Sequence, residues 1–253
     1  MLNIVIPMAG AGSRFVKAGY VDPKPLIPVH SIPMIQLVIS NIMPSCLHRF
    51  IFIAQNSHLD RYNLPGKLET WAKGCSIIGI DGLTAGAACT VLKAKNLINT
   101  EEPLMIANSD QYVDISIDAY LSHGGEKDGQ IMTMSADDPK WSFIDTDDQG
   151  NVTRIVEKEV ISSEATVGIY NFAHGRDFVR AAEAMIEKNF RVNNEFYVAP
   201  AYNQLIREGK KIGWFNIGCV GNGMHGLGTP ADLTRFLRLP LSQQAVEKAA
   251  CIS

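Results

Sequence analysis

Four short apolar runs in the first half of the chain constrain its fold more than any other feature. The runs are Leu2–Ile6, Phe50–Ala54, Ser76–Ile80 and Leu104–Ala107. Continuous hydrophobicity over so few residues is typical of strands that are buried on both faces. Between them, Pro33–Met43 has the apolar spacing of a helix, and Ala85–Leu97 is alanine-rich and free of proline. Strands that alternate with helices predict a parallel sheet covered by helices on both faces.

The second half of the chain has a different pattern, in which strand-like segments follow one another. We expect strands at Gln130–Ser135, Ser142–Asp145, Val152–Val156, Ala165–Phe172, Ile212–Phe215 and Cys219–Gly221, and helices at Gly175–Lys188, Pro200–Glu208 and Pro230–Arg238. No repeat, low-complexity segment or linker separates the two parts. The prediction is one α/β domain over residues 1–253, with halves at about 1–128 and 129–238 and a tail at 239–253 that docks or frays.

Composition excludes several classes of protein. The chain of 253 residues is 46% hydrophobic and 19% charged, with a net charge of -3, which is ordinary for a soluble globular protein. The near-neutral balance argues against nucleic-acid binding. No apolar run approaches the roughly 20 residues of a membrane helix, and Met1–Pro7 lacks the positive start of a signal peptide. The five cysteines are dispersed and form no CxxC pair, so we expect no zinc site or disulfides and a cytoplasmic location.

A glycine-containing loop, Pro7–Phe15, follows the first apolar run directly. Gly10 and Gly12 allow backbone N–H groups to approach a phosphate, and Arg14 adds a planar cation that can bind phosphate oxygens. Neither the dinucleotide fingerprint nor the P-loop pattern is present. A tight turn without a ligand is the alternative.

Lys24 lies between two prolines in Asp22–Val29. The prolines restrict the backbone on both sides, so the lysine is presented from a stiff segment. An ammonium held near a phosphate loop can stabilise charge that develops during phosphoryl transfer. The alternative is a surface loop whose lysine points into water.

Together, Gly10–Phe15 and Pro23–Val29 resemble the signature of the nucleotidyltransferases that make nucleotide-activated sugars, Gly-x-Gly-[Ser/Thr]-Arg followed by Pro-Lys-x-Leu-x-Pro-[Val/Ile]. The resemblance extends over most of the chain. It includes Leu83–Ala87, Asn108–Asp110, Glu157–Lys158, Val167–Phe172 and Gly228–Leu233. It implies a Rossmann-like, mostly parallel sheet with helices on both faces and a smaller β-rich acceptor lobe. The implied reaction moves a nucleoside monophosphate from a nucleoside triphosphate to a phosphorylated acceptor and releases pyrophosphate.

The resemblance assigns roles to individual residues. Arg14, Lys24 and Asp110 would be catalytic, with Asp110 binding Mg²⁺. The nucleotide would contact Met8, Ala9, Gly10, Ala11, Gly12, Ser13, Thr84, Ala85, Gly86 and Ser109. The acceptor would contact Glu157, Lys158, Asn171, Glu195, Tyr197 and His225. Local alternatives remain at four places: Asp110 as a helix N-cap, Glu157–Lys158 as an exposed charge pair, and His225 as a structural histidine. The fourth is Val192–Val198, which holds Glu195 and Tyr197 and could equally be a capped helix start with a hydrophobic anchor.

One position departs from the family pattern. Gly226 stands where sugar nucleotidyltransferases usually have a second metal-binding aspartate. Mg²⁺ can be bound by one carboxylate together with triphosphate oxygens and water. Otherwise another residue helps, and His225 and Asp232 are nearby in sequence. Asp232 is better suited to the first turn of its own helix, near the positive end of the dipole.

The departure and the short second half argue against a sugar phosphate as acceptor. The motifs Pro-Met-Ala-Gly-x-Gly-Ser-Arg-Phe at 7–15 and His-Gly-x-Gly-Thr-Pro at 225–230 resemble a small-acceptor branch of the family that acts in bacterial capsule pathways. The implied reaction there joins CMP from CTP to L-glutamine phosphate, giving CDP-L-glutamine. The first alternative is a hexose-1-phosphate nucleotidyltransferase that uses UTP, dTTP or CTP. A non-catalytic nucleotide-binding regulatory subunit is the second, although Lys24 and Asp110 are both present. A homo-oligomer is compatible with the sequence.

Overall fold

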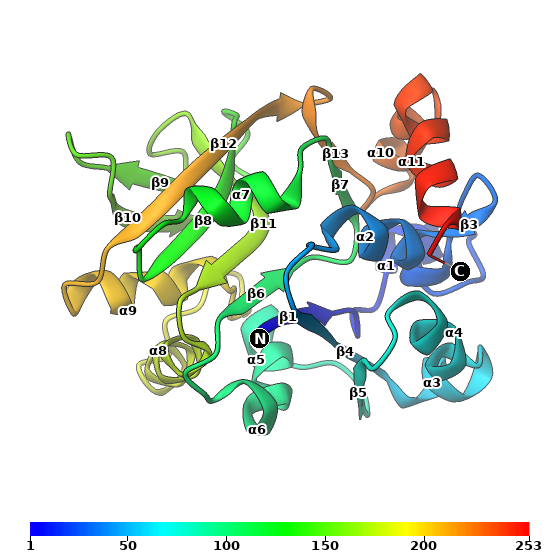
Figure 1. Cartoon of the computed structure of the whole chain (residues 1–253), viewed down its shortest axis with the longest axis horizontal. Helices are drawn as coiled ribbons and strands as arrows, with labels where there is room; N and C mark the ends of the chain where they lie inside the picture. The colour runs from blue at the N-terminus through cyan, green and yellow to red at the C-terminus, as the bar shows by residue number, and fades with distance from the viewer. Residues whose placement is uncertain (253) are drawn as a thin grey trace.

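The structure is a computed structural model that describes residues 1–252. A parallel sheet forms the first half, with strands β1 (Leu2–Pro7), β4 (His48–Gln55), β5 (Ser76–Ile80) and β6 (Leu104–Ala107) in the order β5-β4-β1-β6 (Figure 1). Each neighbouring pair is parallel. The four apolar runs therefore form the sheet that they predict, and their carboxyl ends share one edge, where open α/β sheets bind ligands.

The second half extends the same sheet. Its strands are β7 (Gln111–Val113), β8 (Gly129–Ser135), β9 (Ser142–Thr146), β10 (Val152–Glu157), β11 (Glu164–Phe172), β12 (Ile212–Val220) and β13 (Gly223–Gly226). The order continues from β6 as β11-β8-β12-β13-β7, and β9 joins β10 to β11. β11 is antiparallel to both β6 and β8. β7, next to β6 in the sequence, pairs with β13 and so ties the end of the second half back to the first.

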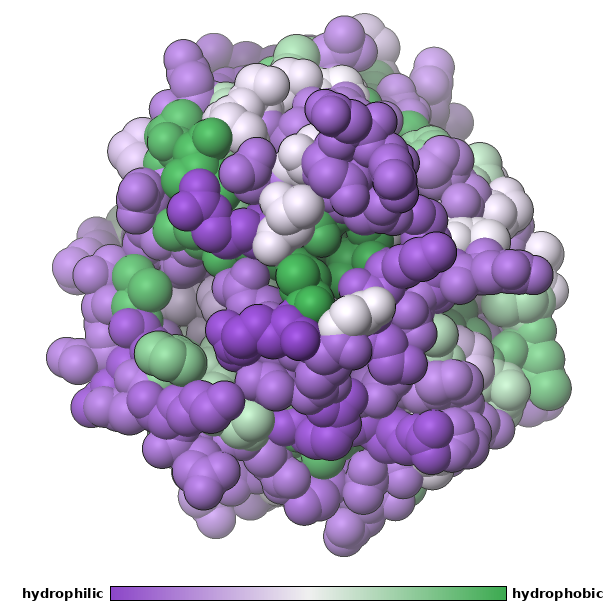
Figure 2. Space-filling model, turned by 90° about the vertical axis from the view of Figure 1, so that its left-hand side faces the viewer, coloured by the Kyte–Doolittle hydropathy of each residue, from purple (hydrophilic) through white to green (hydrophobic). Residues whose placement is uncertain are grey.

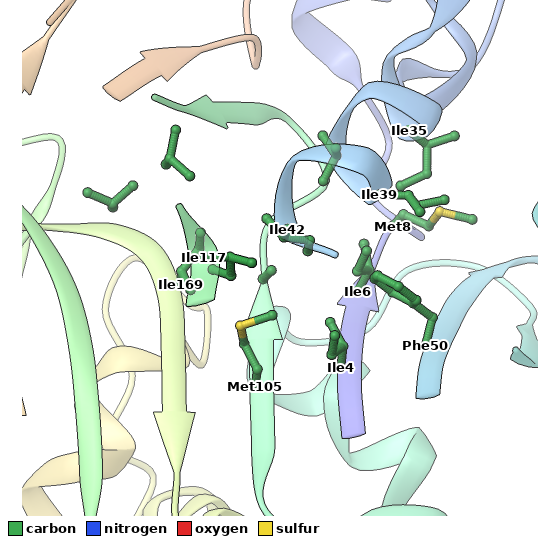
Figure 3. Close-up of a cluster of buried hydrophobic side chains, with 14 of the residues drawn as sticks. Ile4, Ile6, Met8, Ile35, Ile39, Ile42, Phe50, Met105, Ile117 and Ile169 are labelled. Atoms are coloured by element: carbon green, nitrogen blue, oxygen red, sulfur yellow. The ribbon is translucent and has the colours of Figure 1, made fainter. Parts of the chain in front are cut away.

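Helices cover both faces of the sheet, as expected. One face holds α2 (Met34–Ile42), α4 (Leu64–Trp71) and α7 (Ile117–His123), and the other holds α5 (Ala87–Val91), α6 (Lys95–Ile98), α8 (Gly175–Glu187) and α9 (Tyr202–Arg207). Side chains of β1 alternate between the two cores: Ile4 and Ile6 pack towards α2, and Val5 towards α5 and α8. Figure 3 shows Ile6 near Ile39 of α2, and Ile4 beside Phe50 of β4.

A third apolar cluster lies beyond the edge of these two cores. Two helices, α10 (Pro230–Leu237) and α11 (Pro240–Ala250), pack there beside α2 and the short helix α1 (Ser13–Lys17) (Figure 1). The tail beyond 239 is therefore docked as a helix over most of its length. The remaining helix, α3 (Asn56–Arg61), follows β4. Within residues 1–252, no helix combines the length and the apolarity needed to cross a bilayer.

Two expectations about single elements were wrong. Ala85–Leu97 is not one helix: α5 begins at Ala87, a 3-10 turn occupies Leu92–Ala94, and α6 follows. The start is displaced because Gly86 has φ +129°, outside the helical region. Residues 212–221 hold one strand rather than two, with a register shift between Asn216 and Cys219.

Candidate active site

The glycine loop leaves the carboxyl end of β1 in a fixed conformation. The Met8 N–H donates to the carbonyl of Ile53 at 2.9 Å, and Gln55 Nε2 donates to the carbonyl of Ala9 at 2.7 Å. Gly12 then adopts φ +59°, which glycine does without strain, and α1 begins at Ser13. Gly10, Ala11, Ser13 and Arg14 are exposed, so their backbone and side-chain donors face solvent at this edge.

Lys24 lies next to Asp110 across 86 positions of sequence. Its Nζ is 3.0 Å from Asp110 Oδ2, and the two side chains are 21% and 25% exposed. The 3-10 turn Lys24–Leu26 presents the lysine, and a Cβ on Gly12 would lie 3.3 Å from Lys24 Cβ. The structure thus brings the glycine loop, the predicted lysine and the predicted metal carboxylate to one place.

The backbone at Leu227 and Gly228 closely surrounds Asp110, which follows β6. Its backbone carbonyl accepts from the Leu227 N–H at 2.8 Å, and a Cβ on Gly228 would lie only 2.4 Å from Asp110 Oδ2. Gln111 begins β7 rather than a helix, so the N-cap alternative for Asp110 was wrong. A side chain at Gly228 would therefore displace this carboxylate.

The residues present suit Mg²⁺ bound mainly through its substrate. Asp110 Oδ2 accepts from Lys24, whereas Oδ1 has no partner among the described residues. No group of three or more His, Cys, Asp or Glu capable of holding a metal occurs in residues 1–252. Asp232 is 3.7 Å from the place of a Cβ on Gly226, but its Oδ2 accepts from Thr229, the N-cap of α10. One carboxylate with phosphate oxygens and water fits this cation.

The loop predicted to cover the base is fastened to the segment before η3 (Ala199–Ala201). Thr84 Oγ1 donates to the Gly86 carbonyl at 2.9 Å. The Phe196 N–H donates to the carbonyl of Ala85 at 2.8 Å, and a Cβ on Gly86 would lie 2.5 Å from Phe196 N. Ala85 is exposed and Ser109 is buried. Their contacts with a nucleotide stay predictions.

An inner pocket of about 190 Å³ begins beside this site. Its walls include Asn108, which is two residues before Asp110, together with Gly168, Glu157 and Tyr197. Glu157 is 8% exposed and accepts a hydrogen bond from Ser142 Oγ. Burial raises the pKa of Glu157, and the Ser142 hydrogen bond opposes that rise. Glu157 is therefore not the exposed half of a surface charge pair.

Lys158 contacts Tyr197, one of the residues that line the inner pocket. Lys158 adopts φ +59°, its Nζ donates to Tyr197 Oη at 2.5 Å, and the same Nζ lies 4.8 Å from the ring centroid. Glu195 is exposed beside this pair and raises the pKa of Tyr197, although burial is the larger cause. The predicted acceptor residues Glu157, Lys158, Glu195 and Tyr197 are therefore neighbours.

Two predicted acceptor residues lie elsewhere. Asn171 is paired with Met105 and lines a separate cavity with Leu2 and Gly129, towards the opposite ends of the strands. His225 is 6% exposed, with its ring 6.2 Å from that of Tyr112 and 5.5 Å from that of Phe236. Burial lowers the His225 pKa. Asn171 therefore lies apart from the other predicted acceptor residues, and its contact with the acceptor stays a prediction. The burial of His225 favours its structural alternative.

The comparison with known proteins decides the family. A model of the nucleotidyl transferase family matches residues 4–220. The chain belongs to this family. The match contains the glycine loop, Lys24 and Asp110, whereas Gly228 and the helices α10 and α11 lie beyond it.

Individual nucleotidyl transferases resemble the chain over most of its length. The low-salt glycan biosynthesis nucleotidyltransferase Agl11 of Haloferax volcanii is 23% identical, over 98% of this chain and 69% of its own length. The UTP–glucose-1-phosphate uridylyltransferase YngB of Bacillus subtilis is 28% identical, over 66% of this chain and 67% of its own length. A nucleoside-diphosphate-sugar pyrophosphorylase structure from Vibrio cholerae RC9 superposes with a TM-score of 0.80 at 26% identity, covering 93% of this chain and all of that one. The chain therefore spans about two thirds of the length of these curated relatives.

Two supporting residues of the site were missed by the sequence analysis. Gln55 at the end of β4 fixes the glycine loop, and Ser142 of β9 donates to Glu157 of β10. Neither had a local signal, because each acts on a residue of another strand or loop. Asn108 and Gly168 line the inner pocket and lie in segments of the family resemblance, which gave them no individual role.

Proposed function

We propose that this nucleotidyltransferase transfers a nucleoside monophosphate from a nucleoside triphosphate to a sugar 1-phosphate and releases pyrophosphate. The observation that carries the proposal is the 3.0 Å contact between Lys24 and Asp110 beneath the glycine loop. The names of the curated relatives supply the acceptor class, since several are UTP–glucose-1-phosphate uridylyltransferases.

The reaction requires two anions to meet. An oxygen of the acceptor phosphate attacks the α-phosphorus, and the bond from that phosphorus to the bridging oxygen of the pyrophosphate breaks. The backbone of Gly10–Ser13 would hold the triphosphate, and Arg14, which has no ion-pair partner in residues 1–252, would bind the leaving pyrophosphate. Lys24 would lie between the two reacting phosphates and offset their repulsion. Mg²⁺ held at Asp110 supplies further positive charge at the phosphate oxygens.

A second acceptor remains a candidate because of Gly226. A chain that lacks the second carboxylate at this position departs from the sugar nucleotidyltransferase pattern. Transfer of CMP from CTP to L-glutamine phosphate, the reaction implied by the small-acceptor branch, is therefore included in the test.

A panel of substrates tests both proposals. The purified protein is incubated with Mg²⁺, with UTP, dTTP or CTP, and with glucose 1-phosphate, other sugar 1-phosphates or L-glutamine phosphate, and pyrophosphate is measured. We expect release with a sugar 1-phosphate. Release with CTP and L-glutamine phosphate alone would replace the sugar proposal by the second one.

Lys24→Ala is the matched variant for this panel. Loss of an ammonium that acts on developing charge should lower turnover by about 10²-fold or more and weaken nucleotide binding far less. Lys17→Ala, at an exposed lysine at the end of α1, is the control. Unchanged pyrophosphate release by Lys24→Ala would remove Lys24 from the mechanism.

A further inference from the structure

A larger cavity of about 680 Å³ lies next to the inner pocket, and the predicted acceptor residues Glu157, Lys158, Glu195 and Tyr197 are in its wall. We call it the outer pocket; its walls come from residues 155–159, 185–197 and 200–207. It shares Glu157 and Tyr197 with the inner pocket. The two pockets are therefore adjacent, with these two side chains at their boundary. Figure 2 shows the face towards which β9, β10 and α9 lie, largely hydrophilic with an apolar hollow near its middle.

Three cations line the outer pocket without a carboxylate partner. They are Lys158, Arg191 and Arg207, and among the described residues none of them forms an ion pair. Lys158 donates to Tyr197 Oη, and Arg207 Nη2 donates to Gln204 Oε1 at 3.0 Å. Arg191 differs from both, because its guanidinium donates no hydrogen bond to any residue that the structure describes. Its five N–H donors are available to a ligand.

Arg191 is presented from a fixed segment. Its guanidinium carbon lies 5.9 Å from the centroid of the Phe196 ring. The following turn is closed by two backbone hydrogen bonds between Val192 and Glu195, at 3.1 and 2.9 Å. Within this turn, Asn193 and Asn194 both adopt left-handed backbone angles, with φ of +50° and +63°. Asparagine adopts left-handed backbone angles more readily than other non-glycine residues, so the sequence suits this turn.

The same segment contacts the loop predicted to cover the base. Phe196 exchanges backbone hydrogen bonds with Ala85 and Ala88, at 2.8 and 3.0 Å. The position of Arg191 is therefore coupled to the nucleotide loop, and the outer pocket belongs to the same site as the inner one. The Arg191 guanidinium is exposed beside the Phe196 ring, and its planar shape is suited to bidentate binding of a carboxylate.

Carboxylates also line the outer pocket, and they restrict what the ligand can be. Glu159 and Glu195 are exposed in its wall, and Glu157 is buried between the two pockets. They accept hydrogen bonds from hydroxyl or ammonium groups and would repel a ligand that carried only negative charge. The ligand therefore needs donors for these acids as well as one anionic group for Arg191.

We propose that the outer pocket binds the end of the acceptor opposite its phosphate, and that this end carries a carboxylate held by Arg191. The proposal rests on the proposed function, since it narrows the acceptor of that reaction. Two classes of acceptor have the required chemistry. A sugar acid 1-phosphate has hydroxyl donors, and an amino acid phosphate has an ammonium donor.

Binding measurements with matched ligands test the proposal and distinguish the two sources. The full chain, with Mg²⁺ and a non-hydrolysable analogue of UTP or CTP, is titrated calorimetrically with glucuronic acid 1-phosphate and with glucose 1-phosphate. A second pair is L-glutamine phosphate and its α-carboxamide. In one pair, the ligand with the carboxylate should bind at least about 10-fold more tightly than the ligand without it. A hydrogen bond to a charged group has a free energy in this range. The pair that shows this preference identifies the source.

Two variants complete the test. Arg191→Gln should abolish the preference and leave binding of the neutral member unchanged. Arg154→Gln, at an exposed arginine of β10 that is paired with Asp145 outside the pocket, should retain the preference. The proposal is overturned if neither pair shows a preference, or if Arg191→Gln weakens charged and neutral ligands equally.

The proposed function is judged separately, by pyrophosphate release with the natural nucleotides. A carboxylate preference without any pyrophosphate release would support the pocket assignment and contradict the proposed reaction. Pyrophosphate release with neutral acceptors, together with no preference, would contradict the pocket assignment alone.

Discussion

At the scale of single residues, the candidate site depends on how closely the backbone at Gly228 approaches Asp110. A Cβ at this glycine would lie 2.4 Å from Asp110 Oδ2 and 3.3 Å from Cγ, so the carboxylate must move if alanine is introduced. That carboxylate also forms an ion pair with Lys24, so its movement changes the positions of both predicted catalytic charges. Gly228 therefore acts by leaving space for the Asp110 carboxylate, and it has no functional group of its own.

Gly228→Ala should lower turnover strongly and stability only slightly. Small displacements of reacting groups can cost on the order of 10²-fold in rate, whereas the side chain that must move is short and partly exposed. The Mg²⁺ concentration needed for half-maximal pyrophosphate release should rise. Gly226→Ala is the matched control, because the nearest atoms to its Cβ are those of Asp232, at 3.6 to 3.7 Å. Equal effects of both variants would contradict this role of Gly228.

The buried carboxyl of Glu157 makes a second residue-scale prediction, for the pH dependence of stability. Burial raises its pKa in the folded protein, so the folded state binds the proton more tightly than the unfolded state does. The free energy of unfolding should then fall as pH rises from the ordinary glutamate value near 4.3 through the raised folded value. Glu157→Gln should remove this contribution.

Thermal unfolding of both proteins at about pH 4 and about pH 7 measures the effect. The melting temperature of the glutamine variant minus that of the native protein should be larger at the upper pH than at the lower pH. A difference that is the same at both pH values, or that changes in the opposite direction, would show that Glu157 does not titrate as proposed.

At the scale of elements, α11 supports the site from outside the region matched by the family model. Its Val246 belongs to a cluster that includes Phe15, Ile27 and Leu227. Phe15 follows Arg14, the Ile27 N–H donates to the Lys24 carbonyl at 3.2 Å, and the Leu227 N–H donates to that of Asp110. A single cluster therefore contacts all three predicted catalytic segments.

Polar contacts hold α11 against the turn that follows Lys24. His30, which has φ +52°, lies in that turn, with its Nε2 2.8 Å from the Oγ of the buried Ser242. Gln36 Nε2 of α2 donates to the carbonyl of Ala249 at 3.1 Å. These bonds fix α11 relative to the segment that contains Lys24. Weaker packing of α11 should therefore change the position of the Lys24 side chain.

Val246→Ala should therefore reduce turnover as well as stability. Removing two buried methyl groups costs about 1.5 kcal/mol or more by transfer alone. Val179→Ala removes the same groups from α8 in the second core, where Val179 packs among residues such as Phe172 and Phe178. Turnover is measured below both melting temperatures. We expect similar destabilisation in both variants and a several-fold loss of turnover only in Val246→Ala; equal turnover would show that α11 is merely structural.

At the scale of the whole molecule, the chain shows which features sequence can predict. The parallel strands and the motif at Lys24 were predictable because their signals are local: each lies in fewer than ten consecutive residues. The Lys24–Asp110 contact joins segments 86 positions apart and exists only because the fold brings them together. The hydrogen bond from Ser142 to Glu157 depends on the register in which the consecutive strands β9 and β10 pair. Short strands such as β7, with three residues, are too short to show the alternation of apolar and polar residues by which a strand is predicted.

Sheet order also bears on the predicted division at about residue 128. β11 of the second half lies between β6 and β8, and β13 pairs with β7 of the first half. Hydrogen bonds therefore cross the division at two separate places. Neither half can keep its edge strands paired without the other, which predicts one cooperative unfolding unit.

Two variants that each retain one tryptophan can test this cooperativity, because Trp71 lies in the first half and Trp214 in the second. One variant replaces Trp141 and Trp214 by Phe, and the other replaces Trp71 and Trp141. In each variant, fluorescence and far-ultraviolet circular dichroism should give the same melting temperature, since both report one transition. A nucleoside triphosphate with Mg²⁺ should raise that temperature for both probes together, because a ligand of the folded state stabilises the whole cooperative unit. If Trp214 melted apart from the dichroism signal, or if nucleotide protected Trp71 alone, the two halves would be independent units.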